Sequence, residues 1–185
     1  GDDTLQAGGI VFNALSKMPY HIYRGIDRNH PAINKRRYYQ AITGACLACR
    51  AAEFISLRGF APIYLNGCED LELCLRYQQE LHKLLLYNPL SEIYHHESRS
   101  LGRGKYISFN RSLFVRRWRG FIRADDQGYF DEDGFETVEY NLAENDPEGE
   151  TAVYTPTLRS KTAAFSPIDT PPPEQTSGHL KRRWF

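Results

Sequence analysis

The sequence predicts an α/β fold, because strand-like and helix-like segments alternate along its first half. Apolar runs of strand length occupy Thr4 to Phe12 and Gln40 to Cys49. Acidic residues then open a predicted helix over Glu69 to Leu81. Two short strand-like segments follow, at Lys83 to Tyr87 and Ser91 to His95. Strand, helix and strand in this order are typical of a sheet covered by helices.

The composition suits one globular domain, since the 185 residues are 41% hydrophobic and 25% charged. The formal net charge is +0, so bulk electrostatics does not draw the chain to a polyanion or a membrane. Arg99 to Arg123 contains basic and no acidic residues, and Asp125 to Glu150 contains acidic and no basic residues. A nucleic-acid-binding face would not be followed by such an acidic block, so we expect no nucleic-acid partner.

Membrane and targeting signals are absent from the sequence as it stands. No apolar run is long enough to span a bilayer, and no signal-type segment opens the chain. We therefore expect a cytoplasmic location, with peripheral association at the inner face of a membrane left open. The chain starts at Gly1 without Met, which suggests part of a longer protein.

The first strand contains a glycine break at Gly8 and is followed by a long polar and aromatic loop over Asn13 to Tyr39. After the buried strand predicted for Gln40 to Cys49, Arg50 to Leu57 provides one or two helical turns. Gly59 then stands where a helix favours a left-handed residue.

A further helix is predicted from Ser108 to about Phe121, with Phe114, Trp118 and Phe121 on one face. From about Asn141 onwards the acidic and proline-rich sequence has no core-forming period. We therefore divide the chain into a domain over residues 1–130 and a largely disordered tail over 131–185.

The four cysteines, Cys46, Cys49, Cys68 and Cys74, match a zinc site poorly. The first pair is a C-x-x-C, but the second pair has a different spacing. Buried, reduced cysteines in a cytosolic domain are the better interpretation.

Glu69 and Asp70 are the first candidates for chemistry. They lie at the start of a predicted helix, after a glycine-containing loop, and open α/β sheets bind ligands at such loop ends. A carboxylate whose pKa is raised by burial or by a like charge can accept the proton of a substrate hydroxyl. The alternative is an acidic first turn that only complements the helix dipole.

Two further candidates follow in the sequence. His95 and His96 end a predicted strand and face opposite sides, so one of them could bind a divalent metal with ligands from elsewhere. The alternative is one core and one surface histidine. The basic loop from Ser98 to Lys105 has the glycines, hydroxyls and guanidinium groups that suit a diphosphate, or it is a solvated surface loop.

Together, these segments resemble the carboxyl half of family-2 glycosyltransferases of the bacterial cell-surface type. The likeness covers Asp3 to about Phe130. It is carried by these segments: TLQAGGIVF (Thr4 to Phe12), YHIYRG (Tyr20 to Gly25), QAITGACL (Gln40 to Leu47), NGCEDLELCLR (Asn66 to Arg76), YHHESRS (Tyr94 to Ser100), Asn110-Arg111 and Arg117-Trp118. The E-D-x-x-L-C-x-R and Y-H-H-E-S-x-S pair is the most specific part.

The resemblance implies the acceptor-side half of a GT-A fold and an inverting transfer from a nucleotide-diphospho-sugar to a glycan or lipid-linked acceptor. It makes Asp70 the catalytic base. It gives acceptor-binding roles to Glu69, His21 and Tyr23. It makes His95 a ligand of a divalent metal, Mg²⁺ or Mn²⁺, with other ligands in the amino half. It gives donor-binding roles to Gly44, Ser98, Arg99, Ser100 and Arg103.

Some departures from the family pattern affect the functional prediction. The family's acidic G-G-F-D-E turn is Arg58-Gly59-Phe60-Ala61-Pro62 in this chain, and the D-x-D metal motif and nucleotide-binding strand of the amino half are missing. We therefore expect activity in the full-length parent and not in this chain alone. One alternative is a non-catalytic remnant that binds a glycan or a partner. A second, based on less specific motifs such as Glu136-x-x-Glu139, is an ADP-ribosyltransferase.

Overall fold

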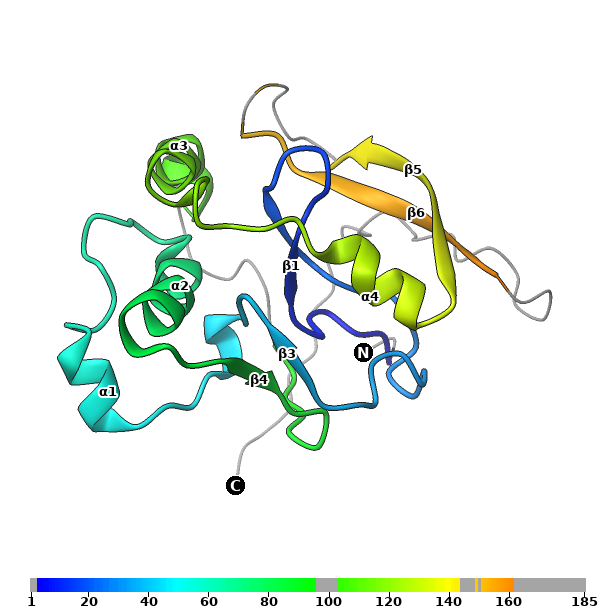
Figure 1. The fold of residues 1–185 in the computed structure, drawn as a ribbon, viewed down its shortest axis with the longest axis horizontal. Helices are drawn as coiled ribbons and strands as arrows, with labels where there is room; N and C mark the ends of the chain where they lie inside the picture. Colours follow the sequence, from blue (N-terminus) through cyan, green and yellow to red (C-terminus); the bar gives the residue numbers. More distant parts are fainter. Residues whose placement is uncertain (1–2, 96–102, 144–148, 150, 162–185) are drawn as a thin grey trace, which may run out of the picture.

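The computed structural model describes residues 3–95, 103–143, 149 and 151–161 (Figure 1). Within these residues the architecture is mixed α/β, as the sequence predicts, with helices packed around small antiparallel sheets. None of the described helices is both long and apolar enough to cross a bilayer.

Each described sheet has two antiparallel strands. β1 (Ile10–Phe12) pairs with β2 (Pro19–His21), and β3 (Arg37–Tyr39) pairs with β4 (Leu85–Tyr87). The N–H of Ile10 also donates to the carbonyl of Ala41 at 3.1 Å, which joins β1 to the chain that follows β3. β1 therefore lies at the centre of the molecule, with the helices of the first half on one side (Figure 1).

The described helices include α1 (Ala51–Ser56), α2 (Glu69–Leu81), α3 (Ile107–Trp118) and α4 (Asp126–Glu132), together with the short 3-10 helices η1 (Gly44–Cys46) and η2 (Arg103–Tyr106). The bounds predicted for α2 are confirmed. Cys68, just before it, and His82, just after it, both have left-handed backbone conformations, with φ of 69° and 53°. At the carboxyl end, the left-handed His82 ends the regular helical hydrogen-bond pattern.

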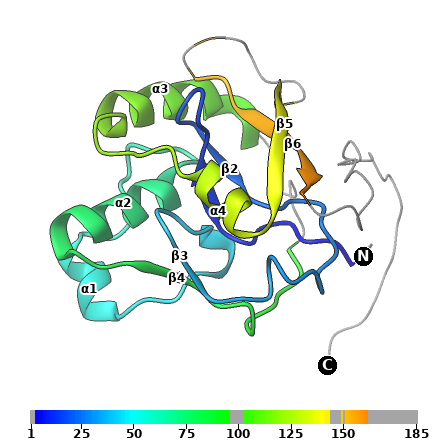
Figure 2. The same ribbon diagram turned by 45° about the vertical axis from the view of Figure 1, so that its right-hand side comes forward.

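β1 separates two hydrophobic cores, because alternate residues of a strand face opposite sides. Ile10 and Phe12 pack into the first core with α2 and α3, where the rings of Phe12 and Phe114 stack with centroids 6.4 Å apart. Val11 faces the second core, which is formed with the segment after β2, α4 and the last hairpin. Figure 1 shows α4 and this hairpin on the side of β1 away from α1 and α2, and Figure 2 shows the hairpin on the opposite side of the molecule from α1 and α2.

Two predicted strands are wrong. Residues 40–49 contain η1 instead of a strand, and Gly44, Ala45 and Cys46 are exposed. The hydroxyl of Thr43 accepts a hydrogen bond from the N–H of Ala45 at 3.3 Å, so a local cap competes with extended pairing at this point. Residues 91–95 are exposed and belong to no strand.

The prediction of a largely disordered tail over 131–185 is also wrong in its first part. β5 (Phe135–Leu142) and β6 (Tyr154–Ser160) form an antiparallel hairpin, and Phe135 and Leu158 are buried in the second core. The apolar contacts come from single residues of each strand, which is too few to give a visible period in the sequence. Residues 162–185 lie outside the described residues.

Candidate functional site

Asp70 is the second residue of α2 and lies at an edge of the first core. The loop before it is held by Asn110 of α3, whose side chain both donates to the carbonyl of Leu65, at 2.9 Å, and accepts from its N–H, at 3.2 Å. Asn110 is buried, so this two-way bond is shielded from water. The amide of Asn110 would also lie 3.4 Å from a Cβ at Gly67. α3 thereby fixes the point at which α2 begins.

A stripe of α2 with four-residue spacing contacts the segment from Gln40 to Gly44, which runs the opposite way. The carboxylate of Asp70 accepts from the N–H of Gly44 at 2.7 Å. The thiol of Cys74 lies 3.6 Å from the carbonyl of Ile42, and the amide of Gln78 donates to the carbonyl of Gln40 at 2.6 Å. Residues four apart share one helix face, so the structure brings the predicted base and Gly44 together.

Glu69 and Cys68 complete this end of α2. One carboxylate oxygen of Glu69 is buried and has no hydrogen-bond partner among the described residues. Burial, together with the charge of Asp70, raises the pKa of the Cys68 thiol to about 12, so this thiol is protonated at neutral pH. An unpartnered buried carboxylate oxygen is costly unless a ligand hydroxyl or a cation meets it. As a whole residue Glu69 is only partly buried, and its role at an acceptor hydroxyl stays a prediction.

A buried ion-pair network connects α2 to the neighbouring elements. The carboxylate of Glu72 is inaccessible to solvent and contacts Arg76 at 2.7 Å and Arg117 of α3 at 3.2 Å. The guanidinium of Arg76 also donates to the carbonyls of Leu57 and of Gly59, the latter at 2.6 Å. This network ties α2 to both α3 and the turn after α1.

His95 is exposed and contacts the segment of chain that precedes β1. Its Nδ1 is 2.8 Å from the carbonyl oxygen of the Gln6 side chain. If this oxygen accepts, Nδ1 carries the proton and Nε2 keeps the lone pair that a metal ligand needs. No hydrogen bond or ion pair joins His95 to Asp70 within the part of the chain that the structure describes.

Among the described residues, no three His, Cys, Asp or Glu side chains are grouped to hold a metal ion. The metal-ligand role of His95 stays a prediction. The further candidates Ser98, Arg99 and Ser100 lie outside the described residues. Arg103 begins η2, directly before α3.

Tyr23, a predicted acceptor-binding residue, faces inward instead. Only 5% of its surface is exposed, and its hydroxyl donates to the carboxylate of Asp133 and to the carbonyl of Tyr129, at 3.2 Å in the latter case. Burial and the hydrogen bond to Asp133 raise the pKa of Tyr23. These contacts correct the predicted acceptor role, because the side chain has no route to a solvent-borne ligand. His21, the other candidate, ends β2 and is partly buried.

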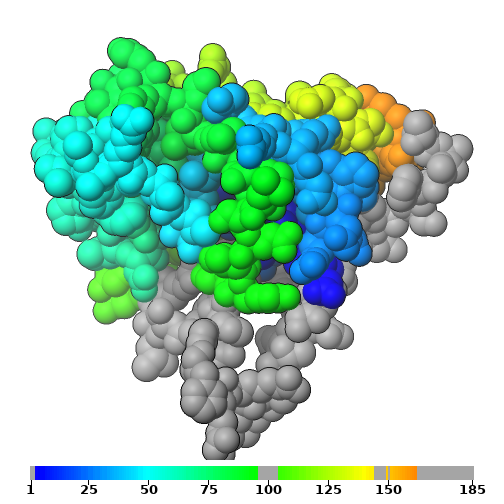
Figure 3. Space-filling view, turned by 90° about the horizontal axis from the view of Figure 1, so that it is seen from below, coloured from blue at the N-terminus to red at the C-terminus, as the bar shows by residue number. Residues whose placement is uncertain are grey.

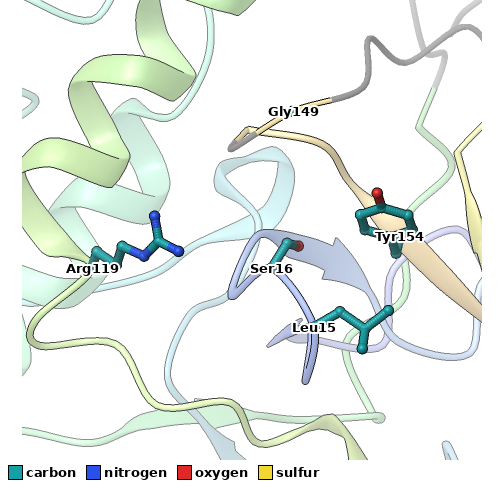
Figure 4. A pocket seen from close by; sticks show the side chains of 5 residues that line it. All are labelled: Leu15, Ser16, Arg119, Gly149 and Tyr154. Atoms are coloured by element: carbon teal, nitrogen blue, oxygen red, sulfur yellow. The ribbon is translucent and has the colours of Figure 1, made fainter.

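Two hollows lie near α3, one at its carboxyl end and one along its side. One, of about 320 Å³, is lined by Leu15, Ser16, Arg119, Gly149 and Tyr154. Figure 4 shows Arg119 reaching from the end of α3 and Tyr154 standing on the strand across the β1–β2 turn. The other, of about 620 Å³, follows α3 from Phe109 to Arg119. None of the predicted site residues that the structure describes lines either hollow.

The underside of the molecule carries a second exposed feature. Figure 3 shows the chain from β4 onwards as a green column between the surfaces of the neighbouring segments. Large apolar residues in and next to this column are exposed, namely Tyr38, Leu84, Leu86, Leu90, Ile93 and Tyr94.

Sequence reasoning missed the supporting residues of the site. The i, i+4 spacing of Glu72 and Arg76 is a signal for a helical ion pair, and it was readable in the sequence. No sequence signal connects Asn110 with Leu65 or Gly44 with Asp70, because these pairs are 45 and 26 residues apart.

Comparisons with known proteins leave the family open. No family model matches the chain, and no solved structure gives a significant match. The chain is similar to the uncharacterized protein y4gI of Sinorhizobium fredii (strain NBRC 101917 / NGR234), with 28% identity over 134 residues. That match covers 67% of this chain and 15% of the relative, so the chain spans a small part of the relative's length.

Proposed function

We propose that this chain is the acceptor-side part of an inverting, metal-dependent glycosyltransferase of family 2, with Asp70 as the catalytic base. The supporting observation is the arrangement at the start of α2. There the Asp70 carboxylate is held against Gly44, and one oxygen of the adjacent Glu69 is buried without a partner. The resemblance of the sequence to this family accounts for both carboxylates and for Gly44.

In this proposal Glu69 accepts a hydrogen bond from the acceptor, and Asp70 takes the proton of the attacking hydroxyl. The hydroxyl oxygen then attacks the anomeric carbon of the donor, the bond to the diphosphate breaks, and the configuration inverts. A bound Mg²⁺ or Mn²⁺, with His95 among its ligands, would stabilise the charge of the leaving diphosphate. The nucleotide-binding part and the cytoplasmic setting, with or without contact to a membrane face, also belong to the proposal.

The test is transfer from a sugar nucleotide by a longer form of the protein that includes the preceding sequence. Asp70→Asn should lower kcat at least about 100-fold, the smaller end of what a general base contributes. Glu80→Gln on the same helix is the control, since Glu80 is remote from the start of α2 and should leave the rate unchanged. An unchanged rate in Asp70→Asn would instead favour a non-catalytic module that binds a glycan or a partner.

A further inference from the structure

Gly44 makes an unusually close approach to the Asp70 carboxylate. Its N–H donates to Oδ2 at 2.7 Å, while the N–H of Leu71 donates to Oδ1 at 2.8 Å. Each carboxylate oxygen thus has one backbone donor, and the two donors come from separate segments of the chain. Because backbone N–H groups have no rotamers, two such bonds define both the position and the rotation of the carboxylate.

The missing side chain of Gly44 is what allows this approach. A Cβ at this position would lie 3.0 Å from the Cβ of Asp70 and 3.3 Å from its Oδ2. Gly44 is not among the glycines with positive φ, so its backbone conformation is open to other residues. The glycine is therefore required by the neighbouring Asp70 and not by the backbone conformation.

The turn that contains Gly44 has little freedom to retreat from α2. Gln78 binds the carbonyl of Gln40, and Cys74 lies against the carbonyl of Ile42. The side chain of Gln40 is itself held, because its amide donates to Asp125 at 2.6 Å and to the carbonyl of Arg123 at 2.7 Å. The segment before Gly44 is thus anchored on α2, and a side chain at position 44 would press on both the Cβ and the carboxylate of Asp70.

We propose that Gly44 is a positioning residue for Asp70, whose N–H aims the carboxylate and whose lack of a side chain keeps it in place. The catalytic part rests on the proposed function, whereas the positional part does not. This role differs from the predicted one, in which Gly44 makes room for the donor sugar. The two roles differ in one respect that can be measured, since positioning acts without any donor present.

The positional part is tested by NMR of the isotope-labelled full chain without ligands. The Gly44 N–H should exchange with solvent at least about tenfold faster in Asp70→Ala, as expected for loss of a hydrogen bond to a charged acceptor. It should exchange at the original rate in Glu80→Ala. The carboxyl and Cβ signals of Asp70 should move in Gly44→Ala and stay in place in Gly120→Ala, since no atom lies within 4 Å of a Cβ at Gly120.

Equal exchange of the Gly44 N–H in the original chain and in Asp70→Ala overturns the proposal, and so do unmoved Asp70 signals in a folded Gly44→Ala. The exchange comparison decides the matter if Gly44→Ala does not fold.

The catalytic part is tested by transfer with the longer form. Gly44→Ala should lower kcat at least about tenfold with KM changed less than about twofold, because a misaimed base affects the reacting complex more than substrate binding. A raised KM with unchanged kcat contradicts the catalytic part and favours the donor contact. Absence of transfer by the unsubstituted longer form contradicts the proposed function, while the NMR result still decides whether Gly44 positions Asp70.

Discussion

The two cores on either side of β1 each bury a helix carboxylate, and the two carboxylates have different partners. The first core, around α2 and α3, holds Glu72 between two arginines, so its buried carboxylate is neutralised by opposite charge. On the other side, the buried Asp126 of α4 accepts hydrogen bonds from the hydroxyls of Tyr20 and Tyr140, both at 2.8 Å. The contacts described for this carboxylate are thus with neutral donors, while the nearby Asp133 pairs with Arg37 and Lys35.

The two sets of contacts connect different elements of the molecule. On the first side the ion pairs connect α2, α3 and the turn after α1, which together place the start of α2 and so Asp70. On the second side the tyrosines attach the β5–β6 hairpin and β2 to α4, and burial and Asp126 raise the pKa of Tyr20. The lesson is that the candidate site depends on the first side, whereas the second side stabilises the hairpin.

Of the changes considered, truncation after Asn141 should destabilise the second core most. It removes β6, whose residues pair with β5 along most of its length, and takes Leu158 out of the second core. We expect the second core to lose cooperative unfolding, because a lone β5 cannot pair its backbone groups. Circular dichroism melting tests this, with truncation after Lys161 as the control that keeps both strands. An unchanged melt after Asn141 would show that the hairpin contributes nothing to the second core.

Glu72→Ala should cost the first core about 3–5 kcal/mol of unfolding free energy, because it leaves Arg76 buried without its carboxylate. Glu80→Ala on the same helix should cost less than about 1 kcal/mol, since its contact with Arg58 is exposed and 4.0 Å long. Urea unfolding measures both. Similar losses for the two variants would mean that the buried network does not stabilise α2.

Asp126→Ala should cost the second core about 2–4 kcal/mol, because two tyrosine hydroxyls lose their acceptor in a buried setting. Asp131→Ala is the matched control on α4, as Asp131 is exposed and pairs only with Lys161 in the described contacts. The measurement is again urea unfolding. A loss as small as that of Asp131→Ala would show that water replaces the carboxylate.

Asp125, which binds the backbone of Phe12 in β1 between the two cores, should give the smallest change in the free energy of unfolding, and this change should depend on pH. Asp125 accepts from the N–H of Phe12 at 2.8 Å and from Gln40, yet burial outweighs these bonds and raises its pKa to about 6. A carboxyl whose folded pKa exceeds its unfolded value of about 4 favours the folded state at low pH. Its contribution is lost as pH rises from about 4 to about 6.

The contribution of Asp125 to the free energy of unfolding should change by about 1–3 kcal/mol over this pH range. This size follows from the difference between its folded and unfolded pKa, reduced because the carboxyl is partly exposed. It is measured as the difference between the pH profiles of unfolding for the original chain and for Asp125→Asn. Parallel profiles would show that the pKa of Asp125 is not raised in the folded state.

Local signals in the sequence were enough for α2 and most of α3. Glu69 and Asp70 at a helix start, after the flexible Gly67, define α2 through contacts between near neighbours in the chain. The inward face of α3 was readable in part, since Phe114 and Trp118 are buried, whereas Phe121, predicted on the same face, lies beyond α3 and is exposed. The glycosyltransferase assignment stays a prediction that rests on motifs and their order.

Tertiary structure alone decided the rest, because contacts between distant residues leave no local period. Gly44 meets Asp70 because η1 replaces the predicted strand. Tyr23 is drawn inward because its hydroxyl meets Asp133, 110 residues away. The hairpin over Phe135 to Ser160 forms because the backbone groups of each strand bind those of the other. Neither strand has enough apolar residues to be predicted from the sequence.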